Sequence, residues 1–410
     1  MKEKQPRLAA VDLGSSMTRV AIAGLVEADA GPAQLQFLGY GEAESAGWRK
    51  GSIEDLDEVT LAVKEAAARA EKASGLAVEA AVVGVGGPHI QGSSTVCGLT
   101  LSLQPRVLNR GDVRRVIETA REIPLSRDRE ILHLVPEEFT LDSRRGIQDP
   151  VGMEGSYLGV QAHILSGSAT ATQNVVTAVN HAGIVVETTV FEAMAAGEEA
   201  LSDEERDLGA MVVDLGSGST ELVAYRDGSL RLASVIPIGG DHFTNDVHLG
   251  LQTPFTDAEL LKKTMGSVLT SQCSDTALVE APGIDGRPTR FVPHRALAGI
   301  LESRAEELLG LILSDLRRAN LDRKLEAGVV LCGGGARLGG LCDLAEHILG
   351  SPARLGLPPR MADMPMELES PEYATVVGLL FYAQRLWKMR AAAQNRNAPK
   401  PWKRYLEGRR

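Results

Sequence analysis

The sequence predicts an α/β protein built from two related halves that face each other across a cleft. Two segments about half the chain apart share one pattern: an apolar strand, an Asp-Leu-Gly-Ser turn beginning at Asp12 or Asp214, and a second apolar strand. Around them, helical periodicity alternates with short runs rich in β-branched residues, as in α/β folds. The chain of 410 residues is also longer than one hydrophobic core usually organises, so two large domains are expected.

The first half is expected to contain an inserted module. Residues 56–74 are rich in Ala, Glu and Lys at helical spacing, and residues 78–85 form a short apolar run typical of a buried strand. The pattern changes over residues 88–165, which predict a small inserted α+β module. Within it we expect strands in residues 90–103, 131–135 and 158–165, and a charged amphipathic helix in residues 110–122.

The second half follows the same plan. After its Gly turn, a further insertion is expected over residues 241–293, followed by a strongly amphipathic helix in residues 295–320. A buried-type strand at residues 329–332 leads to a helix that begins near residue 341. A last apolar helix is expected over residues 372–390, and beyond it the chain turns basic and loses its periodicity.

Composition excludes several classes of protein. The net charge of −11 disfavours nucleic acid as a partner, because affinity for phosphates needs clustered Lys and Arg. The basic start runs straight into the first strand without the apolar core of a secretory signal. No stretch approaches the ~18 consecutive apolar residues that a spanning helix needs. We therefore expect a cytoplasmic protein whose contact with a membrane is at most peripheral.

The two Asp-Leu-Gly-Ser turns have the composition of phosphate-binding loops. Gly lets the backbone approach a phosphate, Ser offers a hydroxyl and an amide, and Asp at the strand end can hold metal-bound water. One such turn is most often an ordinary hairpin, whereas two could grip one phosphate chain with a bridging Mg²⁺. The candidates are Asp12, Gly14, Ser15 and Ser16 in the first turn and Asp214, Gly216, Ser217, Gly218 and Ser219 in the second, with Asp12 and Asp214 as the metal residues.

A third glycine-rich turn ends the strand at residues 329–332. It consists of Gly333, Gly334 and Gly335, and a flat ring could pack on its backbone. Alone, such a run would favour a sharp strand-to-helix connection. In this context, the order phosphate loop, phosphate loop, adenosine loop resembles the actin/Hsp70/sugar-kinase superfamily.

This resemblance implies an actin-like two-domain ATPase fold with duplicated ribonuclease-H-like halves, and bound ATP and Mg²⁺. It puts Arg19 where many members have a phosphate-contacting Lys, and Gly240 in the turn that enters the second insertion. It also implies that Glu259 and Lys262 lie around the nucleoside. For these two residues, a solvated helical face with i,i+3 charge neighbours is the alternative.

Two acidic residues are candidates for catalysis. The resemblance implies that Glu192, at the start of the helix connecting the halves, orients an attacking water, and that Asp214 belongs to the catalytic centre. The alternative role for Glu192 is compensation of the helix dipole. The sequence leaves open whether ATP is hydrolysed, and at most slow hydrolysis is expected.

The insertions narrow the resemblance to one family. Gly-Val-Gly-Gly-Pro-His-Ile at residues 84–90, Pro-Glu-Glu-Phe-Thr-Leu-Asp at 136–142 and Gly-Ile-Gln-Asp-Pro-Val-Gly-Met at 146–153 resemble the bacterial cell-division family FtsA, and the likeness spans residues 8–390. The implied subdomains are 1A in residues 1–87, 166–205 and 366–394, 1C in 88–165, 2A in 206–233 and 303–365, 2B in 234–302, and a basic tail in 395–410.

The FtsA resemblance also implies partners. It implies assembly into actin-like protofilaments, binding of the C-terminal peptide of the tubulin-like protein FtsZ to subdomain 2B, and recruitment of later division proteins through subdomain 1C. Such a protein would tether FtsZ filaments to the cytoplasmic membrane at the division septum.

The end of the chain suggests a short membrane-targeting tail. Trp402, Tyr405 and Leu406 share one helical face, and Lys403 and Arg404 suit an anionic lipid surface. Three apolar side chains on a helix of about ten residues bind a membrane only weakly. We therefore hypothesise that polymerisation supplies avidity, and a disordered basic terminus that never inserts is the alternative.

Two other functions fit the same three loops. One is a PilM-like binding module for pilus assembly, which shares the 1C insertion, and the other is a soluble ATP-dependent phosphotransferase. The run from Gly146 to Gly155 favours FtsA over PilM. For a phosphotransferase, the sequence offers no persuasive Asp on the substrate side.

Overall fold

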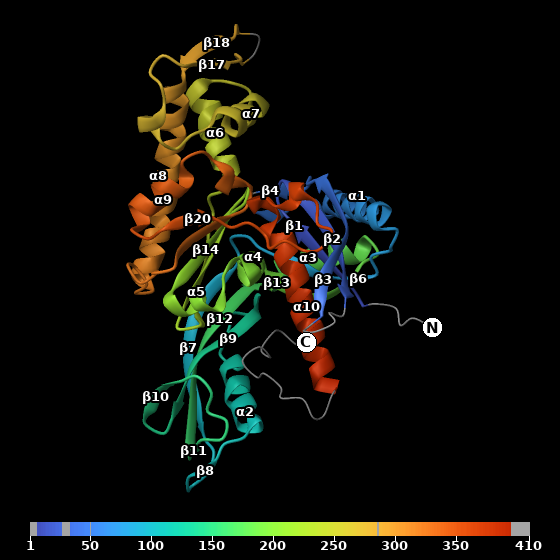
Figure 1. The fold of residues 1–410 in the computed structure, drawn as a ribbon, viewed down its shortest axis with the longest axis vertical. Helices are drawn as coiled ribbons and strands as arrows, with labels where there is room; N and C mark the ends of the chain where they lie inside the picture. The colour runs from blue at the N-terminus through green and yellow to red at the C-terminus, as the bar shows by residue number, and fades with distance from the viewer. Residues whose placement is uncertain (1–5, 27–32, 50, 285–286, 395–410) are drawn as a thin grey trace.

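Two five-stranded sheets of matching topology form the body of the protein (Figure 1). The computed structural model describes residues 6–26, 33–49, 51–284 and 287–394. The first sheet has the order β13-β6-β1-β2-β3 and the second the order β20-β19-β14-β15-β16. In each half, the first two strands of the sheet form an antiparallel hairpin. Two later strands extend the sheet in parallel on the other side of the first strand. The predicted duplication is confirmed.

The strands of the two sheets correspond one to one. The first sheet consists of β1 (Arg7–Leu13), β2 (Met17–Val26), β3 (Gln34–Glu44), β6 (Ala80–Val85) and β13 (Val185–Phe191). The second consists of β14 (Ala210–Leu215), β15 (Thr220–Arg226), β16 (Ser229–Ile236), β19 (Gly328–Cys332) and β20 (Ala353–Leu355). Both central strands, β1 and β14, are buried almost throughout, because helices cover both faces of each sheet.

Alternation along β1 shows which helix covers which face. Ala9 and Val11 belong to the core that contains α1 (Leu56–Ser74), α3 (Ala169–His181) and α4 (Glu192–Ala200). Leu8 and Ala10, which point to the other face, pack with α10 (Ala374–Gln394). The face of β14 that includes Val212 shares the first of these cores, so one core joins both halves.

The outer face of the second sheet has its own core. It is covered by α8 (His294–Arg318) and α9 (Leu341–Leu349), which pack with the alternate residues of β14. A short helix, α5 (Asp203–Leu208), precedes β14. Met211, Val213 and Leu215 of β14 are buried in this core.

Local sequence signals explain why the longest early helix forms where it does. The side chain of Asp55 caps α1 by accepting hydrogen bonds from two first-turn N–H groups. Val59, Val63 and Ala66 follow at helical spacing on its buried face. Gly75 ends the helix with φ of 69°, a left-handed conformation that favours Gly. The predicted bounds of this helix are confirmed.

The inserted module is a four-stranded antiparallel sheet of order β10-β9-β12-β7 with one helix on it. Its elements are β7 (Gln91–Thr100), β8 (Arg106–Val107), α2 (Arg110–Arg121), β9 (Arg129–Leu141), β10 (Arg144–Ile147), β11 (Glu154–Gly155) and β12 (Tyr157–Ser168). Val113, Val116 and Ile117 bury the apolar face of α2 against this sheet. β9 and β12 are longer than the sequence predicted, whereas β7 is shorter than its expected range of 90–103. β9 continues through Pro136 at a β-bulge opposite Gln161 and Ala162.

This bulge places a buried carboxylate between the inserted module and the second sheet. Glu137, directly after Pro136, is 3% exposed, and its carboxylate lies 3.1 Å from Nη1 of Arg231 on β16. The hydroxyl of Ser229 donates to the carbonyl oxygen of Glu137 at 2.9 Å. At Gly92 a Cβ would lie 2.2 Å from the carbonyl oxygen of Ala233, so β7 also approaches β16 closely. The module is therefore tied to the second half as well as to the first.

The second insertion forms a lobe at the opposite end of the molecule from the inserted module (Figure 1). We call it the distal lobe; it consists of α6 (Gly240–Leu251), α7 (Phe255–Met265), η1 (Thr270–Gln272), β17 (Leu278–Ala281) and β18 (Arg290–Pro293). The remaining short elements are a small hairpin, β4 (Trp48–Arg49) and β5 (Ser52–Ile53), and the turns η2 (Gly334–Arg337), η3 (Met366–Leu368) and η4 (Pro371–Tyr373). None of the helices in the described ranges is long and apolar enough to cross a membrane.

One expected helix start differs from the structure, and another is confirmed. The last helix begins at Ala374 rather than at residue 372, because Pro371–Tyr373 form a separate 3-10 turn. The helix expected to begin near residue 341 does begin at Leu341, and a 3-10 turn at Gly334–Arg337 separates it from the strand. The candidate membrane residues Trp402, Lys403, Arg404, Tyr405 and Leu406 lie outside the described residues.

Candidate functional site

A cleft of about 540 Å³ lies where the Gly turns of the two halves meet. The β1–β2 turn and η4 line it from the first half, and the β14–β15 turn, η2, α6 and α7 line it from the second half and the distal lobe. Apart from the tail, every candidate residue of the sequence analysis lines this one cleft: Asp12, Gly14, Ser15, Ser16, Arg19, Glu192, Asp214, Gly216, Ser217, Gly218, Ser219, Gly240, Glu259, Lys262, Gly333, Gly334 and Gly335.

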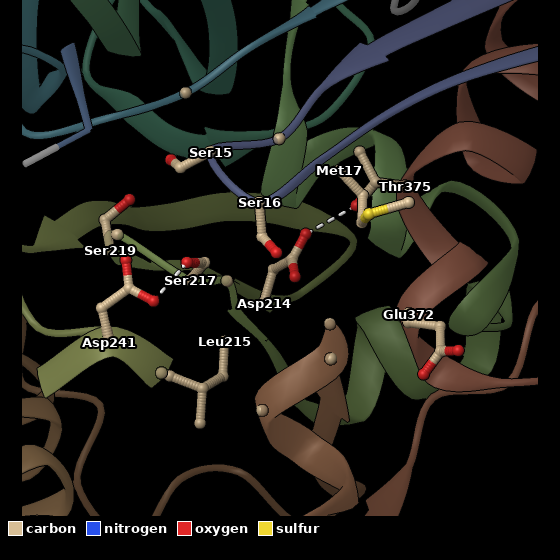
Figure 2. A pocket seen from close by; sticks show the side chains of 18 of the residues that line it. Ser15, Ser16, Met17, Asp214, Leu215, Ser217, Ser219, Asp241, Glu372 and Thr375 are labelled. Atoms are coloured by element: carbon tan, nitrogen blue, oxygen red, sulfur yellow. Dashed lines mark hydrogen bonds between the residues drawn. The ribbon is translucent and has the colours of Figure 1, made fainter. Parts of the chain in front are cut away.

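The two Asp-Leu-Gly-Ser turns face one another across the cleft. Figure 2 shows Ser15 and Ser16 of the first turn opposite Ser217 and Ser219 of the second. A Cβ at Gly218 would lie 3.0 Å from Oγ of Ser15, so the turns approach closely. The hydroxyls and backbone amides of both turns are thus close enough to contact one small anion.

The second turn is fixed by the start of α6. The N–H of Gly240 donates to the carbonyl oxygen of Gly216 at 2.8 Å, and the hydroxyl of Ser217 donates to Oδ1 of Asp241 at 2.7 Å. A Cβ at Gly239 would lie 2.3 Å from the carbonyl oxygen of Ser217, so this close approach requires Gly. The N-terminus of α6 is thereby held beside the turn, with its dipole suited to an anion.

The triple glycine forms a wall of the cleft next to Asp214. Gly333 has φ of 80°, and a Cβ there would lie 2.4 Å from Oδ1 of Asp214. A Cβ at Gly335 would lie 2.4 Å from Cγ of Leu215. At Gly334, by contrast, a Cβ would meet no atom within 4 Å, and this residue is exposed to the cleft. The turn therefore presents bare backbone to the space in front of it.

Glu259 and Lys262 form a partly buried pair at the cleft rather than a solvated helical face. Their side chains are 29% and 13% exposed, and Nζ of Lys262 lies 2.6 Å from Oε2 of Glu259. Lys262 also donates to the carbonyl oxygen of Gly240 at 2.9 Å. Burial would raise the pKa of Glu259, but hydrogen bonds from Lys262 and Thr244 hold it below the ordinary value. The pair joins α7 to the start of α6 at the edge of the cleft.

Arg19 reaches the cleft from β2, directly opposite Asp12 in the β1–β2 ladder. Its guanidinium lies 3.7 Å from Asp12 and 3.7 Å from Glu42, and 5.2 Å from the ring centre of Tyr373. Its Nε is buried and makes no hydrogen bond with the described residues. Arg19 thus brings a positive charge to the lining of the cleft.

Four carboxylates gather at the phosphate end of the cleft: Asp12, Glu192, Asp214 and Glu221. Burial raises the pKa of Asp12 to about 6, against the attraction of Arg19 and with the repulsion of Asp214. Burial, and then the neighbouring acids, raise the pKa of Glu192 and of Glu221 well above the ordinary value. The pKa of Asp214 is also raised by burial, although Thr375 donates to it at 2.6 Å.

This concentration of negative charge fits a cation. Carboxylate oxygens are the ligands that Mg²⁺ prefers, and the two strand-end residues Asp12 and Asp214 come from opposite halves. Within the described ranges, no three His, Cys, Asp or Glu side chains form a ready-made metal cluster. Asp12 and Asp214 are therefore the side chains suited to hold a cation from both halves.

Sequence reasoning missed Glu221, although the signal was present. Arg19 follows Asp12 by the same spacing as Glu221 follows Asp214, and each faces its Asp across the hairpin ladder. The two halves thus carry opposite charges at one equivalent position. Thr375, Glu372 and Tyr373 also line the cleft and were not expected, because only the three-dimensional fold brings the start of α10 to the strand ends.

The crowded carboxylates allow a stability prediction. Glu192→Gln is expected to stabilise the protein without ligand by on the order of 2 kcal/mol at pH 8, because it removes one buried charge from the cluster. A carboxyl group whose pKa is raised in the folded protein contributes stability below its unfolded pKa of 4.5, and this contribution is lost as the pH rises. The stability gained by Glu192→Gln should therefore grow from pH 5 to pH 8. Urea unfolding of both proteins measures it.

The control for this prediction lies on the same helix. Glu198 is also in α4, but its carboxylate pairs with Arg385 at 3.1 Å, so Glu198→Gln should destabilise the protein instead. If both substitutions lowered stability equally at pH 8, the carboxylates at the cleft would not repel one another.

Comparison with known proteins identifies relatives. The protein-family model described as "Cell division protein FtsA" matches residues 211–378 of the chain. The family model described as "SHS2 domain inserted in FTSA" matches residues 87–166. Proteins named Cell division protein FtsA include that of Pseudomonas aeruginosa, 32% identical over 91% of this chain and 88% of the relative. That of Bacillus subtilis is 32% identical over 92% and 83%, and that of Escherichia coli K12 is 30% identical over 91% and 90%.

Solved structures share the fold at lower identity. A chain of the PilM-PilN type IV pilus biogenesis complex matches with a TM-score of 0.66 at 19% identity, covering 93% of this chain and 99% of that chain. MreB5 of Spiroplasma citri bound to ADP matches with a TM-score of 0.56 at 13% identity, covering 93% and 97%. These likenesses confirm the predicted actin-like two-domain fold, and the module match at residues 87–166 agrees with the predicted insertion.

Proposed function

The chain belongs to the FtsA family of cell division proteins, and on this premise we propose that it binds ATP and Mg²⁺ between its halves and tethers FtsZ filaments to the cytoplasmic membrane at the division septum. The observation that carries the proposal is the meeting of both Asp-Leu-Gly-Ser turns and the triple glycine in one cleft of about 540 Å³. Two phosphate-type loops and an open glycine wall match the two ends of a nucleotide.

Each end of the cleft would hold one part of ATP. The Ser hydroxyls and backbone amides of the two turns would bind the phosphates, with Arg19 adding a charged donor. The backbone at Gly334 would face the adenine, and the Glu259–Lys262 pair would lie beside the nucleoside. Asp12 and Asp214 would hold Mg²⁺ through water, and the ion would neutralise phosphate charge.

Glu192 is the residue that would orient a water molecule for hydrolysis. It stands at the first turn of α4, which connects the halves, and lines the phosphate end of the cleft. A raised pKa suits a group that accepts a proton during the reaction.

The proposed partners follow from the family. FtsZ's terminal peptide would bind the region of residues 234–302, later division proteins would bind residues 88–165, and copies of the chain would assemble into actin-like protofilaments. Residues 402–406 would contact the membrane peripherally, with avidity from the filament. The PilM-like alternative retains only likeness of fold, and nothing in the cleft favours a phosphotransferase.

Co-sedimentation tests the proposal. The full chain and a chain truncated after Arg396 are spun with anionic vesicles and FtsZ, with and without ATP and Mg²⁺. We expect ATP-enhanced pelleting of protein and FtsZ with vesicles that is lost on truncation. Absence of lipid binding by both proteins, together with no ATP binding in calorimetry, would overturn the proposal.

Avidity needs its own control. A variant that no longer polymerises should lose most of its vesicle binding, because single tails bind weakly. Undiminished binding by that variant would contradict the avidity hypothesis while leaving the ATP site untouched.

A further inference from the structure

The first turn of α4 is held by a side chain from the inserted module. His133 lies on β9, and its Nε2 accepts a hydrogen bond from the backbone N–H of Phe191 at 3.0 Å. Phe191 immediately precedes Glu192 and caps the N-terminus of α4. The backbone that carries Glu192 is thus fixed from a module that contributes no residue to the phosphate turns.

His133 is well suited to accept this hydrogen bond at any physiological pH. It is 1% exposed, and burial, followed by the nearby Arg385 and Arg121, lowers its pKa to about 4. The imidazole therefore stays neutral, with its hydrogen on Nδ1 and a free lone pair on Nε2. Nδ1 makes no hydrogen bond with the described residues. A buried imidazole with one unused donor costs stability.

Glu221 holds the same region from the second half. It lies on β15, is 3% exposed, and its Oε1 accepts from the N–H of Gly87 at 2.6 Å. Gly87 stands where the chain leaves β6 for the inserted module. The backbone N–H of Ala193, directly after Glu192, lowers the pKa of this carboxylate against the larger effect of burial, which raises it.

Gly86 makes room for both glutamates. A Cβ at this position would lie 2.2 Å from Oε1 of Glu221 and 2.4 Å from Oε2 of Glu192. The two carboxylates therefore press against one stretch of backbone that leads into the inserted module. Any shift of that stretch must move them both.

We propose that His133 and Glu221 are positioning residues that set the place of Glu192, so that the inserted module and the nucleotide cleft are coupled through the first turn of α4. The inference rests on the proposed nucleotide function. A partner that shifts the inserted module would move Glu192 relative to the phosphate turns. By thermodynamic reciprocity, nucleotide binding would change the mobility of β9.

Hydrogen exchange of the wild-type protein is the first test, because it requires neither a variant nor hydrolysis. Adding ATP and Mg²⁺ should slow amide exchange in residues 190–196 and, through His133, in residues 129–141. ATP binding without any change in residues 129–141 would overturn the coupling. Failure to bind ATP at all would instead overturn the proposed function, so the two failures are distinguishable.

A matched pair of variants tests the contact itself. His133→Leu replaces the imidazole by an apolar side chain that stays buried but cannot accept the hydrogen bond from Phe191. His133→Gln keeps an acceptor at the position of Nε2. We expect His133→Leu to speed exchange of residues 190–196 and to lower ATP turnover about 10-fold, with ATP affinity changed less than about 2-fold. His133→Gln should restore most of both. Leu132→Ala, a buried neighbour on β9 that lacks this contact, controls for lost packing and should leave turnover near wild type.

Variants of Glu221 give an independent check if His133→Leu does not fold. Glu221→Gln keeps an oxygen acceptor for Gly87, and Glu221→Leu removes it. The Leu variant should lose turnover and protection of residues 190–196, and the Gln variant should keep more of each. Equal turnover and equal exchange across both pairs, with ATP still bound, would show that neither residue positions Glu192.

Discussion

Gly334→Leu is expected to weaken ATP binding at least about 100-fold while leaving the fold of the nucleotide-free protein intact. A Cβ at Gly334 meets no atom within 4 Å, so the added side chain has room in the empty cleft. The same space is where the adenine would lie, and leucine would fill it. Isothermal calorimetry with ATP and Mg²⁺ measures the affinity, and thermal unfolding without nucleotide measures the fold.

The neighbouring glycine is the matched control. Gly333 has φ of 80° and would place a Cβ 2.4 Å from Oδ1 of Asp214, so Gly333→Ala should destabilise the protein by about 1–3 kcal/mol even without nucleotide. If Gly334→Leu bound ATP as the wild type does, the triple glycine would not form the adenosine side of the cleft.

Arg231→Met is expected to lower the free energy of unfolding by about 2–4 kcal/mol at pH 7. Glu137, which is 3% exposed, would lose the cation that lies 3.1 Å from its carboxylate. Its hydrogen bonds from Ser94 and Gln161, at 2.8 and 2.7 Å, remain, but these neutral donors offset less of the cost of a buried charge. Urea unfolding of both proteins measures the loss.

Glu137→Gln provides the rescue. In the Arg231→Met background it removes the unpaired charge and should recover roughly half of the lost stability, a coupling that a double-mutant cycle isolates. Additive effects of the two substitutions would show that the residues do not interact.

The sign of the pH dependence also follows. Burial would raise the pKa of Glu137, but its hydrogen bonds and Arg231 hold it below the ordinary value of 4.5. A carboxyl group with a lowered pKa contributes stability above the unfolded value that is lost as the pH falls through the folded one. The difference between wild type and Arg231→Met should therefore shrink as the pH falls below about 4.5.

The parts of the fold that follow from local periodicity could be read from the sequence. The bounds of α1 match because Asp55, the apolar spacing and Gly75 all act within one helix. Both Asp-Leu-Gly-Ser hairpins were also recognisable, because their turn chemistry is local and occurs twice. Two copies of a weak signal predicted the duplication and the shared cleft.

Features that depend on contacts between distant segments could not be read in this way. The strand expected over residues 131–135 stops before Pro136, yet β9 passes through this residue because the facing strand accommodates a bulge there. Likewise His133 sits in an apolar run that predicts only a core strand, and its bond to Phe191 exists only once β9 of the inserted module packs beside β13. Glu221 was within reach, since it repeats the spacing of Arg19, but its opposite charge concealed the equivalence.

The close packing of the inserted module on β16 bears on how its function can be studied. β16 is the last strand of the second sheet, and β7 and β9 cover it. Deleting residues 88–165 would uncover that strand, whose unpaired backbone groups are a template for joining other chains. Aggregation or loss of activity in such a deletion variant would then have two causes that the experiment does not separate: the exposed sheet edge and the missing partner site. Single substitutions at Arg231 and His133 disturb the module while leaving that edge covered.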